Sequence, residues 1–328
     1  MSRLLVVGAT GQLGSEVVRQ AAALGLPVRA LVRRSSRHLH LETNGVELAY
    51  GDLKDAESLK EACAGVTAVV STATVVFPQG RYSFEEDEGK GYTNLVEACR
   101  QQGVQQLLFT SIAVPFSASN LRRVPSLRFK AACEKLIRES GVPYTIFRCT
   151  PFMDDYFALM GSSIPLRGEV CATLNRSRGL TRLTRRLLGT TIEQWGVALV
   201  PGPSAARHAF IAVKDVAAYL VAAIGASHAY NATFEVGGPH SISWQDVAEI
   251  YAELLGRRVL ALSTPVGMYR TLARASQPWS QAFSNQMALL RALGEHETRV
   301  DSRDVAQRFG VSLTSAETYL SEKVHAGR

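Results

Sequence analysis

The sequence predicts an α/β protein with a doubly wound parallel sheet and a smaller C-terminal lobe. Three observations lead to this prediction. Short apolar runs alternate with amphipathic stretches of helical length up to about residue 150, as in successive strand, helix, strand units. A glycine-rich turn follows the first of these runs directly. The chain of 328 residues is 46% hydrophobic and only 20% charged, so it can bury a large core.

Six apolar runs of the first half have the length and composition of buried strands. We expect strands at 4–7, 28–32, 46–49, 68–72, 106–111 and 144–148. The stretches between them predict helices at 13–23, 58–64, 92–103 and 129–140. Each of these helices ends near a glycine, as helix C-termini prefer. Strands and helices in this order fit a doubly wound sheet.

The second half is less regular, and it defines the predicted division of the chain. We expect strands at 197–200, 209–213 and 234–236 and helices at 216–224 and 247–255. Ser243 and Asp246 have the spacing of a capped helix start. We predict a first domain at 1–155 and a substrate-facing lobe at 156–328, with segments near 197–236 returning to the main sheet.

Composition excludes several classes of protein. The apolar run at 4–7 is too short for a signal peptide, and no stretch reaches the roughly 18 apolar residues of a membrane span. Five cysteines lie far apart without a Cys-x-x-Cys pair, which argues against a metal site or disulfides. We therefore expect a cytoplasmic protein without a bound metal.

The net charge of +7 is concentrated in two clusters. Arg33, Arg34 and Arg37 form the first, and five arginines between Arg176 and Arg186 form the second. A basic stripe attracts nucleic acid, anionic lipid or an acidic ligand, but a solvated helix face has the same composition. Because the second cluster has no interleaved aromatic residues and no known motif, nucleic acid is the least favoured of these partners.

The turn from Gly8 to Gly14 has the composition of a dinucleotide-binding loop in a Rossmann fold. Gly8 permits a sharp turn, Gly11 permits close approach of a pyrophosphate, and Gly14 permits tight packing of the following helix. The helix N-terminus offers free N–H groups to the phosphates. We expect the intervening residues of this turn to contact the cofactor as well; they are Thr10, Gln12 and Leu13. A tight turn without a ligand is the alternative.

The end of the second predicted strand favours NADP(H) over NAD(H). A carboxylate at this place accepts the ribose 2′-OH of NAD, whereas an arginine suits the 2′-phosphate of NADP. The sequence here is Arg33-Arg34-Ser35-Ser36, without a carboxylate. Arg33 is therefore the expected phosphate ligand, assisted by Arg34, although an exposed loop arginine is the alternative.

The glycine spacing G-x-x-G-x-x-G in Val6-Val-Gly-Ala-Thr-Gly-Gln-Leu-Gly14 resembles the opening of atypical and extended short-chain dehydrogenases, particularly the NmrA-like group. In these families an aspartate after the third strand bonds the adenine amino group, which implies this role for Asp52 beside Leu53. A turn or a helix cap is the alternative. Small residues after the fourth strand admit the cofactor ribose or simply pack under a helix; they are Thr72, Ala73 and Thr74.

A second resemblance concerns the expected helix at 129–140. The segment from Phe129 to Arg148, with its Gly-x-Pro-Tyr-Thr strand entry, resembles the lysine helix of NmrA-like and isoflavone-reductase-like proteins. Ordinary short-chain dehydrogenases have Tyr-x-x-x-Lys here, but Ser126 stands where the tyrosine belongs. The resemblance implies that Lys130 donates or relays a proton, since a partly buried lysine can act as an acid. Holding the nicotinamide ribose is its alternative role.

Three further positions follow from the same resemblance. Ser111 lies where short-chain dehydrogenases have a hydroxyl that polarises the substrate, although serine is also common in turns. Phe152 lies in a segment that would flank the nicotinamide or belong to the core. The segment around Asp215 resembles a later helix start of the family, which that residue would cap.

The leading functional hypothesis is an NADPH-dependent reductase that transfers hydride to a small carbonyl, quinone or conjugated double bond. The rival hypothesis is a non-catalytic NADP(H) sensor, regulator or assembly factor, with a protein as its partner. The missing tyrosine weakens the case for ordinary alcohol dehydrogenase chemistry without excluding reduction. The substrate and the oligomeric state are not encoded in any pattern that we recognise.

Overall fold

Seven parallel strands form the main sheet of the protein, in the order β3-β2-β1-β4-β5-β6-β9. The computed structural model describes residues 3–42, 45–73, 89–114 and 117–326. The strands are β1 (Leu4–Val7), β2 (Val28–Val32), β3 (Val46–Tyr50), β4 (Ala68–Ser71), β5 (Gln106–Ile112), β6 (Tyr144–Cys149) and β9 (Ala232–Val236). Strand order reverses between β1 and β4, where Val7 lies opposite Ser71. This arrangement confirms the predicted doubly wound Rossmann fold.

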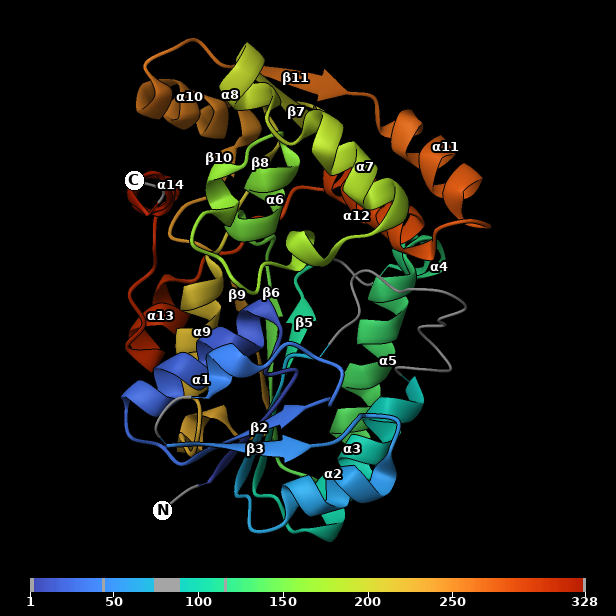
Figure 1. Ribbon diagram of the computed structural model, residues 1–328, viewed down its shortest axis with the longest axis vertical. Helices are drawn as coiled ribbons and strands as arrows, with labels where there is room; N and C mark the ends of the chain where they lie inside the picture. The colour runs from blue at the N-terminus through green and yellow to red at the C-terminus, as the bar shows by residue number, and fades with distance from the viewer. Residues whose placement is uncertain (1–2, 43–44, 74–88, 115–116, 327–328) are drawn as a thin grey trace.

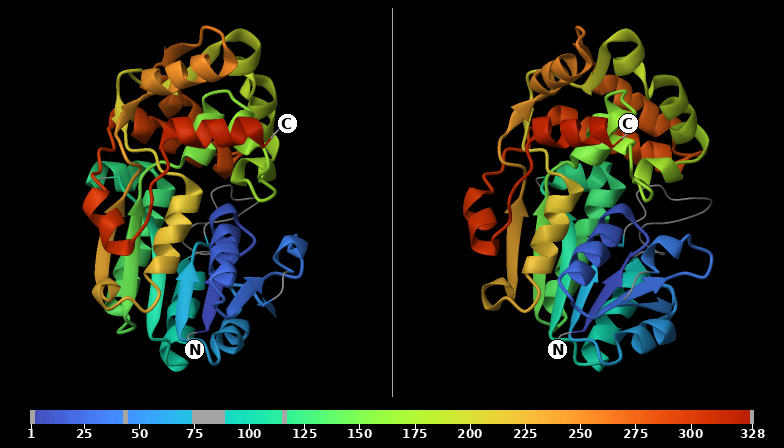
Figure 2. Two further views of the ribbon diagram at one scale, coloured as in Figure 1. Left: turned by 90° about the vertical axis from the view of Figure 1, so that its left-hand side faces the viewer. Right: turned by 60° about the vertical axis from the view of Figure 1, so that its left-hand side comes forward.

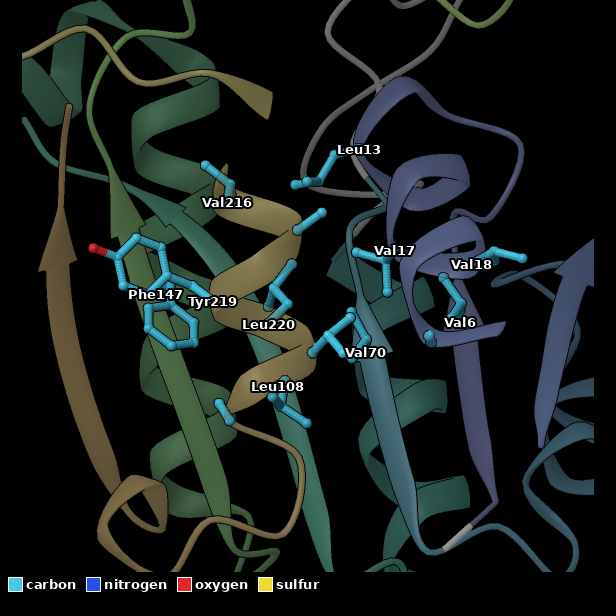
Figure 3. Close-up of a cluster of buried hydrophobic side chains, with 14 of the residues drawn as sticks. Val6, Leu13, Val17, Val18, Val70, Leu108, Phe147, Val216, Tyr219 and Leu220 are labelled. Carbon is cyan, nitrogen blue, oxygen red and sulfur yellow. The ribbon is translucent and has the colours of Figure 1, made fainter. Parts of the chain in front are cut away.

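Helices cover both faces of this sheet, as Figure 1 shows. One face carries α1 (Gln12–Ala23), α9 (Val213–Ala222) and α13 (Arg303–Phe309), and the other carries α2 (Ala56–Cys63), α3 (Lys90–Gln101) and α5 (Pro125–Glu139). In Figure 3, α1 and α9 lie side by side, and Val17 and Leu220 point into the cluster that covers Val70 and Leu108. Each buried side chain of this size contributes about 1.5–3 kcal/mol to folding.

The short helix α13 completes the first face from far along the chain. The ring of Phe309 lies 5.6 Å from the ring of Phe147 in β6 and 5.1 Å from the ring of Phe234 in β9. Edge-to-face contacts at these distances add to the energy of burial. The sheet core is therefore closed by a residue near the other end of the sequence.

The second lobe lies beyond the carboxyl ends of the strands (Figure 2). Its helices are α6 (Met153–Leu159), α7 (Gly179–Leu188), α8 (Thr191–Trp195), α10 (Trp244–Leu255), α11 (Val266–Ser276), α12 (Gln281–Glu295) and α14 (Ala316–His325). Two small sheets join them: β7 (Val197–Pro201) with β11 (Leu260–Thr264), and β8 (Arg207–His208) with β10 (Ile242–Ser243). A core around Phe157, Phe210 and Trp244 holds this lobe together. One more helix, α4 (Ala118–Arg123), leads directly into α5.

Two local predictions for the second half are wrong. Residues 209–213 form no strand, because β8 ends at His208 and α9 begins at Val213; of these residues, Ile211 forms a single bridge to Phe152. Asp215 does not cap α9, since it lies within the first turn and accepts hydrogen bonds from the N–H and hydroxyl of Thr314 at 2.7 and 2.8 Å. It ties α9 to the chain that precedes α14.

The capping box expected before α10 is confirmed. The Ser243 hydroxyl accepts from the N–H of Asp246, and the Asp246 carboxylate accepts from the N–H of Ser243. Of the segments near 197–236, β9 joins the main sheet, whereas β7 pairs with β11. The division of the chain at residue 155 stays a prediction.

Some features are absent from the described part of the chain. No helix in it has the length and apolar character to cross a bilayer. Nor do three His, Cys, Asp or Glu side chains gather there as a metal site would require. All five cysteines are buried and free.

Candidate functional site

The carboxyl ends of four neighbouring strands bring the predicted site residues to one edge of the sheet. Gly8 follows β1, and Ala73 lies just beyond β4. Ser111 is the penultimate residue of β5, and Phe152 lies a few residues after β6. Strand pairing fixes this alignment, with Ser71 opposite Val7 and Ile112 opposite Cys149. In doubly wound sheets this edge, at the reversal of strand order, is where ligands bind.

The three glycines of the first turn have different structural requirements. Gly8 has a φ of +87°, and a Cβ there would lie 2.8 Å from the backbone nitrogen of Ala73. A Cβ on Gly14 would lie 2.1 Å from the carbonyl oxygen of Gly8, so α1 packs directly on the turn. A Cβ on Gly11 would meet only the Gly8 oxygen, at 3.1 Å. Gly11 thus leaves open space above the turn, which is where a pyrophosphate approaches.

The N-terminus of α1 has the features of an anion-binding site. Ser15 is the first residue of α1 whose N–H bonds back to the turn, and its acceptor is the carbonyl of Gly11. The N–H groups of Gln12, Leu13 and Gly14 have no acceptor among the described residues. No side chain caps this helix, and its first turn holds no acidic residue. Free N–H groups at a helix N-terminus bind phosphate. The turn therefore fits a dinucleotide.

Gln12 joins this turn to the second lobe. Its side chain is buried, donates to Oδ1 of Asp154 at 3.3 Å and accepts from the N–H of Thr173 at 3.1 Å. Thr173 begins a short 3-10 helix that ends at Arg176. The guanidinium of Arg176 donates to the carbonyl of Thr10. Part of the second basic cluster therefore lies against the phosphate-binding turn, which the sequence did not reveal.

The adenosine side of the site contains the first basic cluster. Arg33 is exposed after β2, and Arg34 extends over the ring of Tyr50, with its guanidinium carbon 4.9 Å from the ring centroid. The Asp52 carboxylate accepts from the N–H of Lys54 at 3.0 Å, while Asp55 caps α2. Asp52 therefore shapes a turn, and its contact with adenine stays a prediction.

The chain after β4 forms the next part of the site. Thr72 bonds the carbonyl of Val7 through its N–H, and Tyr92 donates from its hydroxyl to the carbonyl of Ala73 at 2.7 Å. Thr74 lies outside the described residues. The neighbouring carbonyl of Leu53 accepts from Asn94 of α3. The contact of Thr72, Ala73 and Thr74 with the cofactor ribose stays a prediction.

Lys130 lies on the buried side of α5. Its side chain is 5% exposed, Nζ donates to the carbonyl of Thr110 at 2.8 Å, and it stands 4.5 Å from the Phe109 ring centroid. Burial raises the pKa of the Cys149 thiol to about 12, and the Lys130 charge opposes this shift. The lysine thus lies against the ends of β5 and β6.

Ser111 lies in the same region. Its hydroxyl is buried without a hydrogen bond of ordinary geometry among the described residues. Nearby Glu134 forms ion pairs with Arg148 and Arg138. Burial favours a higher pKa for this carboxyl, but Arg148, Ser111 and Arg138 together hold the pKa of Glu134 below its usual value. The structure thus brings Ser111 and Lys130 to the same strand end.

Ser126, which stands where the tyrosine belongs, lies against α12. Its N–H donates to Oδ1 of Asn285 in α12 at 3.3 Å, and its own hydroxyl is buried without a partner among the described residues. The Nδ2 of Asn285 and the Oε1 of Gln286 are also buried and unpaired there. Sequence reasoning missed this polar group because α12 carries no recognisable motif.

An apolar cavity of about 160 Å³ adjoins this polar group. Gln286 lines it together with aromatic and aliphatic side chains from α6, α7, α11 and α12. Among these side chains are Tyr156, Phe283, Met287 and Leu290. Its surface is mainly apolar with few polar groups, as in sites for small organic molecules.

Two acids at the start of α6 were also missed. Burial raises the pKa of Asp154 to about 6 and that of Asp155 to about 7, and neighbouring carboxylates add to both shifts. One oxygen of Asp155 is buried without a hydrogen bond to any residue that the structure describes. The available signal was a pair of acids directly after an apolar strand, next to Phe152. Phe152 itself is partly buried and packs against the sheet core.

The chain resembles known proteins over most of its length. Photosystem II assembly factor Ycf39 of Cyanophora paradoxa is 26% identical to this chain over 97% of it and 91% of its own length. An NAD(P)H azoreductase of Xenophilus azovorans is 26% identical, over 83% of this chain and 84% of its own. The two relatives are named for different kinds of function.

Solved structures share the fold. A Citrobacter triphenylmethane reductase complexed with NADP(H) superposes with a TM-score of 0.71 at 21% identity, covering 98% of this chain and all of the other. The NADPH complex of the quinone oxidoreductase QOR2 of Escherichia coli gives 0.70 at 18% identity, covering 97% and 99%. A family model described as NmrA-like matches residues 1–319. The chain is therefore a member of the NmrA-like family.

Proposed function

We propose that this protein is an NADPH-dependent reductase that acts on a small apolar or aromatic carbonyl, quinone or conjugated double bond. The observation that carries the proposal is the shared sheet edge: the phosphate-binding turn stands at its start and buried Lys130 at its far side. An apolar cavity next to a buried polar group lies in the adjoining lobe. Sites of this kind bind organic substrates and orient them.

In this proposal, each residue of the site has a separate role. The N–H groups of α1 hold the pyrophosphate, and Arg33 and Arg34 hold the 2′-phosphate, because guanidinium forks match phosphate oxygens. NADPH supplies a hydride when it is bound. Lys130 holds a proton at Nζ for the substrate oxygen, and the Ser111 hydroxyl polarises that oxygen. The apolar side chains of α12 exclude water from the substrate.

A second function is favoured by the similarity to Ycf39 of Cyanophora paradoxa, which covers 97% of this chain. In it the protein is an NADP(H)-dependent assembly factor or sensor, and a protein takes the place of the substrate. The absence of a tyrosine four residues before Lys130 also favours this alternative.

Oxidation of NADPH separates the two functions. The full chain is tested against a panel of quinones, enones, aromatic carbonyls and azo and triphenylmethane dyes, beside Lys130→Ala and the matched variant Lys135→Ala on the exposed side of the same helix. We expect turnover that falls about 100-fold or more in Lys130→Ala only. Tight NADPH binding without turnover of any compound would instead support the assembly factor. Turnover that Lys130→Ala leaves unchanged would remove the role assigned to Lys130.

A further inference from the structure

A second cavity, of about 230 Å³, is lined by residues of α4, α11 and α12. It shares no lining residue with the glycine turn or the apolar cavity. Five arginines and one glutamate line it: Arg122 and Arg123 from α4, Arg270 and Arg274 from α11, and Arg291 and Glu295 from α12. We call it the arginine cavity.

The charges around this cavity are not balanced. Arg291 is buried and paired with Glu295 at 2.8 Å, so its charge is neutralised. The other four arginines are exposed, and none forms an ion pair or hydrogen bond with another described residue. Like charges around one hollow repel each other; water and salt screen part of this repulsion, and a counter-charge that enters the hollow relieves the rest.

The space between the arginines is kept open by small side chains. Ala273 of α11 and Ala288 and Ala292 of α12 line the wall beside Val124. Alanines cannot fill the hollow, whereas guanidinium groups at its rim reach into it from two sides. Arginine forks match phosphate oxygens in pairs, with shorter and stronger hydrogen bonds than neutral donors make.

We propose that the arginine cavity binds an anion with two or more phosphate charges, such as a soluble polyphosphate or the phosphomonoester headgroup of a lipid, at a site separate from the dinucleotide. Bound there, the anion holds α11 against α4. Val124 ends α4, starts α5 and packs with Leu127, Ala288 and Ala292. The ligand thereby braces the first turn of the helix that carries Lys130.

Calorimetric titration of the full chain with sodium pyrophosphate tests the site, in the absence and presence of saturating NADPH. Without NADPH, pyrophosphate can also occupy the phosphate-binding turn, so the event that we assign to the arginine cavity is the one that persists with saturating NADPH. Arg270→Ala/Arg274→Ala should weaken it by about tenfold or more, the loss of charge-assisted bonds. Arg308→Ala, an exposed arginine of α13 without an ion pair among the described residues, is the matched control and should change nothing.

Thermal melting at low salt shows whether the double variant is folded, so that a loss of binding is not caused by misfolding. Because the two arginines of α11 have no partner among the described residues, their removal should leave the melting temperature of the free protein unchanged or slightly raised. In the presence of saturating NADPH, which occupies the phosphate-binding turn, pyrophosphate should then raise the melting temperature of wild type and of Arg308→Ala but not of the double variant. Equal pyrophosphate binding by the double variant and wild type, or no binding by wild type, would overturn the site for soluble anions.

Sedimentation with phosphatidylcholine vesicles, with and without phosphatidic acid, distinguishes the source of the phosphate. Binding that needs phosphatidic acid, is displaced by pyrophosphate and is lost in Arg270→Ala/Arg274→Ala identifies a lipid headgroup. Binding of pyrophosphate alone identifies a soluble ligand. If neither ligand binds, or the double variant binds both as wild type does, the proposal is wrong. These outcomes do not depend on whether the protein reduces anything.

Discussion

Gln12 donates from Nε2 to Oδ1 of Asp154 at 3.3 Å, across 142 positions of the chain. The same side chain accepts from the N–H of Thr173. One residue of the phosphate-binding turn thus touches two separate segments of the other lobe. We therefore expect cofactor binding at the turn and the position of the lobe to be coupled through it.

Gln12→Ala should therefore affect both stability and cofactor binding. The change leaves the buried Asp154 oxygen without this donor, at a cost of about 1–3 kcal/mol in the free energy of unfolding. Urea unfolding measures this cost, and fluorescence titration with NADPH measures the weaker binding. Gln101→Ala, on the exposed end of α3, is the control. Unchanged stability and affinity in Gln12→Ala would show that the lobes are not coupled here.

The glycines of the turn should respond differently to substitution. Gly14→Ala places a Cβ 2.1 Å from a backbone oxygen, so we expect a loss of about 3 kcal/mol in stability. Gly11→Ala places its Cβ 3.1 Å from the same oxygen and otherwise in open space. It should fold, yet bind NADPH at least tenfold more weakly, because the methyl group occupies the approach of the pyrophosphate. Melting curves and NADPH titrations of both variants provide the comparison.

Cofactor preference should depend on the first basic cluster. Arg33→Ala and Arg34→Ala each remove a guanidinium that we assign to the 2′-phosphate, which corresponds to about a tenfold loss of NADPH affinity. NADH lacks that phosphate, so its affinity should stay within about twofold. Arg37→Ala, in the same loop, is the control. Tighter binding of NADH than of NADPH by wild type would contradict the preference itself.

The pH dependence of stability should include a contribution from His208. The ring is fully buried against Phe210 and Trp244, and burial lowers its pKa from 6.5 to about 4, slightly opposed by Glu297. The unfolded state binds this proton more readily, so the stabilising contribution is complete above about pH 6.5 and is lost as the pH falls toward 4.

Urea unfolding at pH 7.5 and pH 5 checks this. The stability difference between wild type and His208→Gln should shrink by about 2 kcal/mol at the lower pH. His240→Gln, at an exposed position, controls for the general effect of acid. A difference that is the same at both pH values would mean that the imidazole titrates normally in the folded protein.

The sheet was predictable because its central strands are buried on both faces. Val6 and Val70 are buried and apolar like their neighbours in the strand, so continuous apolar runs indicate these strands. The same signal at 209–213 was misleading, since those residues form no strand. The glycine turn was predictable because its geometry depends on the absence of side chains at Gly8 and Gly14. Local sequence carries both signals.

The second lobe was less predictable because its contacts are not local. Asp215 has the appearance of a helix cap, yet its partner is Thr314, 99 positions away. Arg176 belongs to a basic run in the sequence, but only the fold brings it to Thr10. Asn285 is an ordinary helix residue until α12 meets Ser126. Such pairings depend on tertiary packing, which periodicity does not encode.

The position of Phe309 sets an order of events during synthesis. Its ring closes the core beside Phe147 and Phe234, and so a ribosome must add more than 300 residues before that part of the sheet face is fully covered. Until then, the nascent chain exposes apolar surface at these two rings, which is surface of the kind that chaperones protect. A chain interrupted between β9 and α13 would carry all seven strands with α1 and α9 in place, but without the ring that covers Phe147 and Phe234. Quality control in the cell could therefore distinguish truncated from complete copies by a patch of two aromatic rings.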